Sequence, residues 1–465
     1  MSTAERFERY MEHLAAGLGH ADRHSGLRGY CTGLMLPLER KSVEPMAASI
    51  DPLRASARHQ ALHHFVAQAE WSDQEMLRRV AQWVMAGMDL SAGAYWIVDD
   101  TGFPKKGAHS VGVARQYCGQ LGKQDNCQVA VSVSLATEAA SLPVAYRLYL
   151  PKQWAGDRAR RVKAGVPPEV RFATKGQIAL AQLEHLLRAG APRHCVLADA
   201  AYGTDSYFRL RLSELGLAYV VGIVCSVSVW PPGVDPLPAK PYSGRGRPPL
   251  APRRQPLSVS ALAQSLPPSA WQRVSWREGS NQQLSGRFAA LRVRHAGGNT
   301  GRARLWPSQW LLSEWPDDER EPTKYWLSTL PQDIAINDLV AAAKMRWRIE
   351  RDYLELKQEL GLGHYEGRSW RGFHHHASLS IAAYGFLVAE QLTAGKRSGA
   401  KKNFIERQVP ALPTGYIARG SPARTATRPQ IHRDVASSDQ RSVGHVRPSL
   451  PVLRTRKRKT TLVTQ

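Results

Sequence analysis

The stretch WIVDDTGFPKKGAHSVG, residues 96–112, carries the strongest structural signal in the chain. It begins with residues typical of a buried β-strand and runs into two adjacent acids, Asp99 and Asp100, with Lys105 and Lys106 just beyond. Carboxylates at the tip of a strand suit hard divalent cations such as Mg²⁺, which prefer oxygen ligands. Lysines beside such a metal favour a polyanion. The stretch therefore predicts a metal site at a strand end, next to a bound polyanion.

The overall charge points the same way. The 465 residues include 63 Lys and Arg against 39 Asp and Glu, a formal net charge of +24. Such an excess favours nucleic acid as a partner, and an anionic membrane surface second. No apolar run approaches the roughly 18 residues of a spanning helix, and the N-terminus MSTAERFERY leads into no signal-type apolar core. We expect a cytosolic protein that does not engage membranes.

The first part of the chain, residues 1 to about 90, is expected to be helical. In SDQEMLRRVAQWVMAG, Ser72 is a candidate N-cap with Glu75 three residues on, and Gly87 is a natural stop. The apolar residues of this stretch recur at helical spacing, a pattern more typical of a core-facing stripe than of a recognition surface.

From Ala94 the pattern changes to short β-rich runs. Three such runs are followed by an amphipathic helix closed by Gly190, then by a strand, a helix and a further strand. This order favours an α/β layer built on a mixed sheet. Residues 231 to about 325 are rich in Pro, Gly and Arg and then alternate, which indicates a β-rich insertion. Residues 335–360 return to a helical pattern, and the basic tail beyond 396 loses periodicity, as disordered segments do.

A second acid, Asp199, ends the strand in VLADAAYG. Neighbouring parallel strands would bring Asp199 close to the Asp99–Asp100 pair, because their carboxyl ends meet at one edge of the sheet. Two metals about 4 Å apart need carboxylates that bridge and flank them, so a third acid is expected.

The third acid is sought in KMRWRIERDYLELKQELGLGHYEGRSW. Seven residues span nearly two helical turns, about 700°, so Arg346, Glu350 and Lys357 form one stripe. An acid flanked by two bases suits a metal ligand beside phosphates. The alternative is that Glu350 merely pairs with Arg346, four residues earlier, on a solvated helix face.

These motifs together resemble the DDE transposases of bacterial insertion sequences. The resemblance is to the branch with a Tyr-x2-Arg-x3-Glu-x6-Lys signature, which Arg346, Glu350 and Lys357 fit, although Ala343 stands at the Tyr position. It extends from about residue 20 to 410 and includes DDTGFPKKG, ARQYCGQLGKQDNCQ, VLADAAYG and ELGLGHYEGRSWRGFHHH, in that order.

The resemblance implies an α/β fold with a ribonuclease-H-like catalytic core. It assigns catalysis and metal binding to Asp100, Asp199 and Glu350, with Mg²⁺ as cofactor and Mn²⁺ as an alternative. Asp100 is chosen over Asp99 because the family's first acid directly precedes the threonine, here Thr101. The choice between the two stays open on the sequence alone.

The expected organisation has five parts. They are a helical N-terminal domain that binds DNA (1–90), the first part of the ribonuclease-H-like core (91–230), a β-rich insertion (231–325), the completion of the core with the third acid (326–395) and the basic tail (396–465). The expected partner is double-stranded DNA, both the terminal inverted repeats of the transposon and the target. A homodimer is expected on DNA, in the bacterial cytoplasm and associated with the nucleoid.

Several residues are expected to contact DNA. Arg245 and Arg247 lie in GRGRPP, which contains the core of an AT-hook, although a flexible basic loop that contacts only phosphates is the favoured interpretation. Trp326 is a candidate for stacking on a displaced base, with a buried core tryptophan as the alternative. The adjacent histidines 374–376 cannot all ligate one ion and are expected to be polar residues near DNA. The full set is Lys105, Lys106, Arg245, Arg247, Trp326, Arg346, Lys357 and Arg368.

Two other functions remain open. One is a DNA-binding protein that kept the fold and lost the chemistry, against which the three acids argue. The other is a ribonuclease-H-like nuclease that hydrolyses DNA without joining it, against which the insertion and the basic tail argue.

Overall fold

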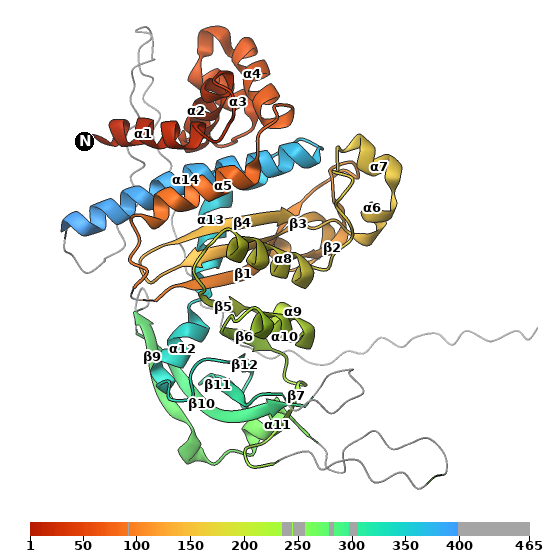
Figure 1. Ribbon diagram of the computed structural model, residues 1–465, viewed down its shortest axis with the longest axis vertical. Helices are drawn as coiled ribbons and strands as arrows, with labels where there is room; N and C mark the ends of the chain where they lie inside the picture. Colours follow the sequence, from red (N-terminus) through yellow and green to blue (C-terminus); the bar gives the residue numbers. More distant parts are fainter. Residues whose placement is uncertain (92, 235–243, 245–255, 279–282, 297–305, 399–465) are drawn as a thin grey trace, which may run out of the picture. The chain divides into compact units, whose positions relative to one another are not determined.

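The computed structural model of the chain describes residues 1–91, 93–234, 244, 256–278, 283–296 and 306–398 (Figure 1). Arg245, Arg247 and residues 399–465 of the predicted tail lie outside the described residues. No helix in the described part is both long and apolar enough to cross a bilayer.

The first ninety residues are largely helical. Helix α5 starts where the sequence indicated, since Ser72 Oγ accepts a hydrogen bond from the Glu75 amide at 3.1 Å. The Glu75 carboxylate does not complete the capping box, because it accepts hydrogen bonds from Arg78 and Arg79 instead. The helices are α1 (Thr3–Ala15), α2 (Asp22–Met35), α3 (Val43–Ile50), α4 (Ala55–Ala67) and α5 (Asp73–Met85).

The central sheet confirms the predicted order of three strands, helix, strand, helix, strand. Its strands are β1 (Tyr95–Pro104), β3 (Lys123–Ala136), β4 (Ser141–Leu148), β5 (Cys195–Ala198) and β6 (Tyr219–Ile223), and its helices α8 (Lys175–Arg188), α9 (Ala200–Gly203) and α10 (Ser206–Glu214). Strand β1 runs antiparallel to β3 and parallel to β5, and β5 runs parallel to β6. The short elements β2 (Ala114–Cys118), α6 (Lys152–Gly156) and α7 (Arg158–Lys163) were not predicted from the sequence.

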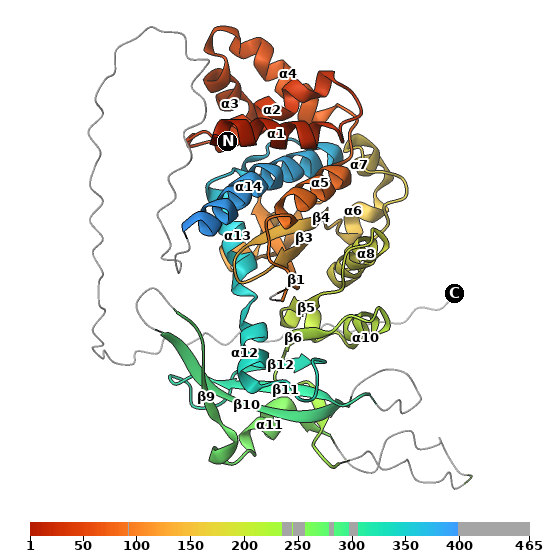
Figure 2. The ribbon, with the colours of Figure 1, turned by 60° about the vertical axis from the view of Figure 1, so that its left-hand side comes forward.

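The β-rich segment after residue 230 continues this sheet. Strand β12 (Lys324–Ser328) pairs antiparallel with β6, and the order then runs through β11 (Gln309–Trp315) to β10 (Gln283–His295) (Figures 1 and 2). Strand β6 would otherwise end the sheet with unpaired backbone groups, and β12 covers that edge. The remaining elements are β7 (Ser228–Trp230), β8 (Leu257–Ser258), α11 (Val259–Gln264) and β9 (Gln272–Glu278).

In the C-terminal helical region, a short turn separates two consecutive helices. Helix α12 (Ile336–Lys344) and helix α13 (Trp347–Gln358) are separated by Met345 and Arg346, and α14 (Trp370–Ser398) follows. Tyr353 of α13 hydrogen-bonds Ser132 of β3, which lies opposite Asp99 in the antiparallel register. Helix α13 therefore covers the sheet face that carries Asp99.

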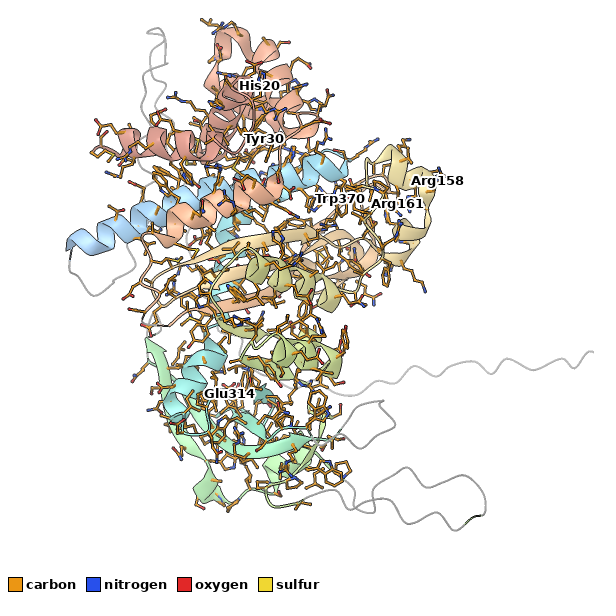
Figure 3. The ribbon with its side chains drawn as sticks, viewed as in Figure 1. His20, Tyr30, Arg158, Arg161, Glu314 and Trp370 are labelled. Atoms are coloured by element: carbon orange, nitrogen blue, oxygen red, sulfur yellow. The ribbon has the colours of Figure 1, made fainter. Side chains whose placement is uncertain are left out.

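The three adjacent histidines are buried in α14, which corrects their expected place near DNA. His375 lies within hydrogen-bond distance of the Val66 and Trp71 carbonyls, at 3.1 and 2.9 Å, and its ring stacks on that of Trp71. His376 hydrogen-bonds the hydroxyl of Tyr30 on α2 (labelled in Figure 3) at 2.9 Å. These imidazoles join α14 to the N-terminal helices, so their role in the fold is structural.

Candidate active site

The acids of β1 and β5 follow the last paired residues of two parallel strands. The pairing of β1 with β5 ends at Ile97 and Leu197, and Asp99 and Asp199 each stand two residues further on. Because side chains alternate between the faces of a strand, this spacing gives the two acids the same orientation. Trp96, Ile97 and Val98 are buried, as expected for a central strand covered on both faces.

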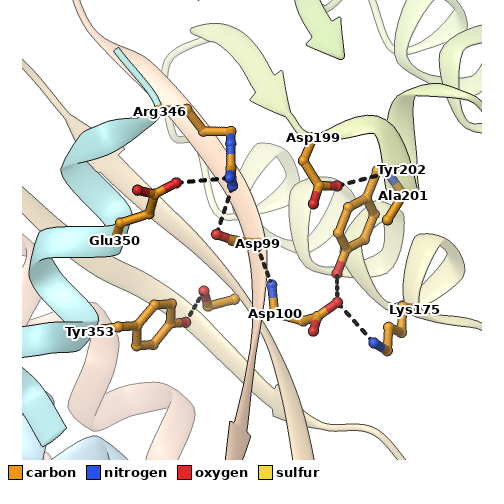
Figure 4. A network of polar contacts seen from close by, with 10 residues as sticks. Asp99, Asp100, Lys175, Asp199, Ala201, Tyr202, Arg346, Glu350 and Tyr353 are labelled. Carbon is orange, nitrogen blue, oxygen red and sulfur yellow. Dashed lines mark hydrogen bonds and ion pairs between the residues drawn. The ribbon is translucent and has the colours of Figure 1, made fainter. Parts of the chain in front are cut away.

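Arg346 connects the β1 acid to the acid on helix α13. Its Nη1 donates to Asp99 Oδ2 at 2.7 Å and its Nη2 donates to Glu350 Oε1 at 3.0 Å (Figure 4). The Arg346–Glu350 contact is the pairing along one helix face that the alternative interpretation of Glu350 predicted. The contact to Asp99 goes beyond that alternative, because it reaches across 247 positions of sequence.

The electrostatics of this cluster indicate converging negative charge. Burial and, to a lesser extent, the charge of Asp199 raise the pKa of Asp99 to about 6, against the opposing effect of Arg346. Burial lowers the pKa of Arg346, but the charges of Asp99, Asp199 and Glu350 outweigh it and leave the pKa raised. Arg346 therefore stays charged and balances three carboxylates that sit near one another.

Asp100 points away from this cluster. Its Oδ2 accepts hydrogen bonds from Lys175 Nζ at 3.0 Å and from the Tyr202 hydroxyl at 3.2 Å, on the opposite face of β1 (Figure 4). Of the sequence-predicted acids, the structure brings Glu350 and Asp199 together around Asp99 and Arg346. It does not bring Asp100 onto their face.

A metal site in the usual sense does not form within the described residues. In that part of the chain, no group of three His, Cys, Asp or Glu side chains converges closely enough to hold an ion. Arg346 instead supplies the positive charge between Asp99 and Glu350. The donor set still suits a hard divalent cation, because all three side chains offer carboxylate oxygens and one has a pKa raised by burial and by a neighbouring acid.

The predicted DNA-contacting residues differ in accessibility. Lys106 and Arg368 are exposed, whereas Lys105 is half-buried and its Nζ donates to the Tyr365 carbonyl at 2.7 Å. Lys357 Nζ donates to the Gly102 carbonyl at 2.7 Å and to Gln120 Oε1 at 3.1 Å. Burial lowers the pKa of Lys357 to about 8. Lys106 and Arg368 are thus free to meet a phosphate directly, while Lys105 and Lys357 also hold local structure.

Trp326 lies in strand β12 beneath a lysine. Its ring is half-buried, packs against the core and has Lys344 Nζ 5.3 Å from its centroid. Lys344 in turn pairs with the buried Glu314 of β11 at 2.6 Å (Glu314 is labelled in Figure 3). This setting agrees with the core-tryptophan alternative and leaves part of the ring exposed.

Sequence reasoning missed the partners of Asp100. Tyr202 stands three residues after Asp199, in the quoted VLADAAYG, and is buried. Lys175 directly follows Thr174, the N-cap of α8. Tyr202 lies in a quoted motif, but the face to which each side chain turns depends on packing between elements that are distant in sequence.

Comparison with known proteins defines the class of this chain. The family of DDE superfamily endonucleases matches residues 13–283, so the chain belongs to that family. The match contains Asp99, Asp100 and Asp199 and ends before Arg346 and Glu350.

More particular similarities accompany the family match. Over 192 residues the chain is 32% identical to a Microchaete diplosiphon protein named "Probable transposase for insertion sequence element IS701". The aligned region spans 41% of this chain and 46% of that relative, which is less than half of each. A solved structure of the piggyBac transposase synaptic complex with hairpin DNA aligns with 77% of this chain and 55% of its own, at 11% identity and a TM-score of 0.34. A structural similarity this low does not define the fold of this chain.

Proposed function

We propose that the chain is the transposase of a bacterial insertion sequence, which cleaves DNA at the transposon ends and joins the freed strand to target DNA. The observation that carries the proposal is the arrangement of Asp99, Asp199 and Glu350 around Arg346. Family membership and the IS701 relative support it. Such a protein would act in the bacterial cytoplasm, on the nucleoid.

The sheet supports a ribonuclease-H-like core. Strands β4, β3 and β1 are antiparallel neighbours, and β5 and β6 extend β1 in parallel. We propose this core for residues 91–230, completed by 326–395, with a DNA-binding helical domain in 1–90 and a β-rich insertion in 231–325. The pairing of β12 with β6 means that the insertion would extend the core sheet.

The proposed metal ligands are Asp99, Asp199 and Glu350. We favour Asp99 over the Asp100 indicated by the sequence motif, because Asp99 shares a face with Asp199 and reaches Glu350 through Arg346. Mg²⁺, or Mn²⁺ in its place, would supply an activated nucleophile and stabilise the leaving oxygen during in-line displacement. The carboxylates would hold the cation, and Arg346 would turn to a phosphate oxygen, for which a guanidinium fork is suited.

DNA is the proposed partner, both the terminal inverted repeats and the target. The net charge of +24 supports a polyanion, and the exposed Lys106 and Arg368 are proposed phosphate contacts. Lys105 and Lys357 would contribute positive potential close to the acids. Trp326 is proposed to stack on a displaced base through its exposed part. We propose a homodimer on DNA, since two transposon ends must be joined to one target.

The test is cleavage and strand transfer with a labelled transposon-end duplex and a plasmid target, in Mg²⁺. Asp99→Asn, Asp199→Asn and Glu350→Gln should each lower both steps by at least about a hundredfold, because metal-held charge contributes several kcal/mol to the barrier. Glu359→Gln, an exposed acid at the end of the same helix, is the matched control.

Two results would contradict the proposal, and each would favour a different function. Cleavage without strand transfer would indicate a nuclease that only hydrolyses. DNA binding without cleavage by the unaltered protein, in either metal, would indicate a binding protein that has lost the chemistry.

A further inference from the structure

Asp100 has a well-defined environment of its own. Its carboxylate is 22% exposed, and one oxygen, Oδ2, accepts from both Lys175 and Tyr202. The Tyr202 side chain is buried at 2% exposure. Asp100 therefore already has a cationic partner and a hydroxyl donor.

The two partners of Asp100 come from two different helices. Lys175 is the first residue of α8, and Tyr202 belongs to α9. The N-cap of α9 is Asp199, whose Oδ1 accepts from the Ala201 amide at 2.9 Å. Asp100 Oδ2 thus connects β1, through the Tyr202 hydroxyl, to the helix that Asp199 caps.

Helix α9 depends on such contacts for its position. It has four residues, far fewer than a helix needs to be stable alone. Gly203 packs so closely on β6 that an added Cβ would lie 2.1 Å from the Gly222 carbonyl oxygen. One end of α9 is therefore fixed against β6, and Tyr202 fixes it against β1.

These contacts link the segments that carry Asp99 and Asp199. The backbone pairing of β1 with β5 stops at Ile97 and Leu197, before either acid. Beyond that point, the Asp100–Tyr202 hydrogen bond is a side-chain link between the two strand ends. Asp100 is the neighbour of Asp99 in the chain, and Tyr202 lies one helical turn after Asp199.

We propose that Asp100 is a positioning residue: through Tyr202 and Lys175 it holds Asp99 and Asp199 at the spacing at which they bind a divalent cation. The proposal rests on the proposed function of Asp99 and Asp199 as metal ligands. It gives the two adjacent acids of the DDTG motif different tasks, one on each face of β1.

The experiment measures Mn²⁺ binding by isothermal titration calorimetry on the full chain without DNA, together with melting temperature in a chelator. Asp100→Ala and Tyr202→Phe should weaken Mn²⁺ binding by about 10–100-fold, as loss of groups that orient metal ligands commonly does. Asp100→Asn keeps an oxygen for the Tyr202 hydroxyl and should weaken binding less than Asp100→Ala. Tyr207→Phe, which alters an exposed tyrosine on the next helix, should leave binding unchanged.

DNA cleavage at rising Mn²⁺ separates positioning from ligation. Excess Mn²⁺ should restore cleavage by Asp100→Ala and Tyr202→Phe, because their ligands remain, and should fail to restore cleavage by Asp99→Asn. If Asp100→Ala does not fold, Tyr202→Phe and Lys175→Met carry the same test, since neither removes an acid.

These experiments separate failure of the positioning role from failure of the proposed function. If Asp100→Ala cannot be rescued while Asp99→Asn can, Asp100 is itself a ligand and the inference is wrong, although the proposed function stands. If Asp100→Ala and Tyr202→Phe bind Mn²⁺ like the unaltered protein, the positioning role is likewise wrong. If the unaltered protein binds no Mn²⁺ and does not cleave, both the proposed function and the inference fall.

Discussion

Arg346 Nη1 lies 2.7 Å from Asp99 Oδ2 and joins the start of helix α13 to the tip of strand β1. Both side chains are largely buried, at 25% and 16% exposure. Paired charges in such a setting constrain each other, because removing one leaves the other without compensation. The contact therefore fixes α13, with Glu350 on it, against the strand that carries the first acid.

Removing the guanidinium should destabilise the protein through Asp99. We expect Arg346→Met to lower the free energy of unfolding at pH 7 by about 1–3 kcal/mol, since a mostly buried carboxylate loses its charged partner. Asp99→Asn in the Arg346→Met background should recover part of that loss. Urea unfolding of the two single variants and the double variant measures the coupling, and strictly additive effects would contradict a direct contact.

Glu350→Gln should separate stability from chemistry. The Glu350 side chain is 65% exposed and its bond to Arg346 spans one helical turn, so the change should alter stability by only a few tenths of a kcal/mol. DNA cleavage should nevertheless collapse, because the amide cannot replace a charged metal ligand. A Glu350→Gln protein that cuts and joins DNA at the normal rate would remove this residue from the site.

DNA binding should weaken steeply with salt. Each phosphate neutralised contributes about −0.9 to the slope of log K against log salt concentration. Lys106→Ala and Arg368→Ala should each reduce the slope by about one unit if the exposed side chain contacts a phosphate. Fluorescence anisotropy across a salt series measures the slope. A slope that neither substitution changes would place the DNA elsewhere on the protein.

The buried histidines of α14 should make the fold sensitive to acid. Burial lowers the pKa of His375 and His376 to about 4, from a value of 6.5 when unperturbed. Between these values the unfolded chain binds protons that the folded protein does not. The free energy of unfolding should therefore fall as the pH is lowered from about 6.5 to about 4, by up to about 1.4 kcal/mol per pH unit for each histidine.

Comparison with a His375 variant separates the contribution of this histidine from that of other titratable groups. Burial raises the pKa of Asp352 to about 6, which contributes the opposite sign over part of the same range. The difference between the unaltered protein and His375→Gln cancels that contribution. We expect His375→Gln to flatten the pH dependence below 6.5, and His63→Gln, which alters an exposed histidine on α4, to leave it unchanged. Equal slopes in all three proteins would show that His375 does not titrate on unfolding.

Much of the fold could be predicted from local patterns in the sequence. Apart from the short β2, α6 and α7, the order of elements between residues 95 and 223 was readable because buried strands and amphipathic helices leave distinct periodicities. The cap at Ser72 is a short-range contact and was equally visible. The continuation of the sheet through β12 was not readable, because pairing between distant strands leaves no local signal.

For the candidate site, local sequence patterns indicated which acids to consider but not the face of the sheet to which each side chain turns. Asp199 and Glu350 stood out as acids at a strand end and on a helix stripe. Choosing between Asp99 and Asp100 required knowing which face of β1 meets α13, and adjacent residues of a strand differ in that respect. The burial of histidines 374–376 likewise depends on the N-terminal helices packing on α14, which the histidine run itself does not indicate.

The central claim is that Asp99, and not Asp100, ligates the metal together with Asp199 and Glu350. The most direct measurement compares DNA cleavage rates in Mg²⁺ and in Mn²⁺ for Asp99→Cys and Asp100→Cys, because a thiolate is a poor ligand for hard Mg²⁺ and a better one for Mn²⁺. We predict that Asp99→Cys is inactive in Mg²⁺ and regains cleavage in Mn²⁺, whereas Asp100→Cys shows no such preference for Mn²⁺ beyond that of the unaltered protein. A switch to Mn²⁺ dependence in Asp100→Cys, with Asp99→Cys lacking it, would contradict the account.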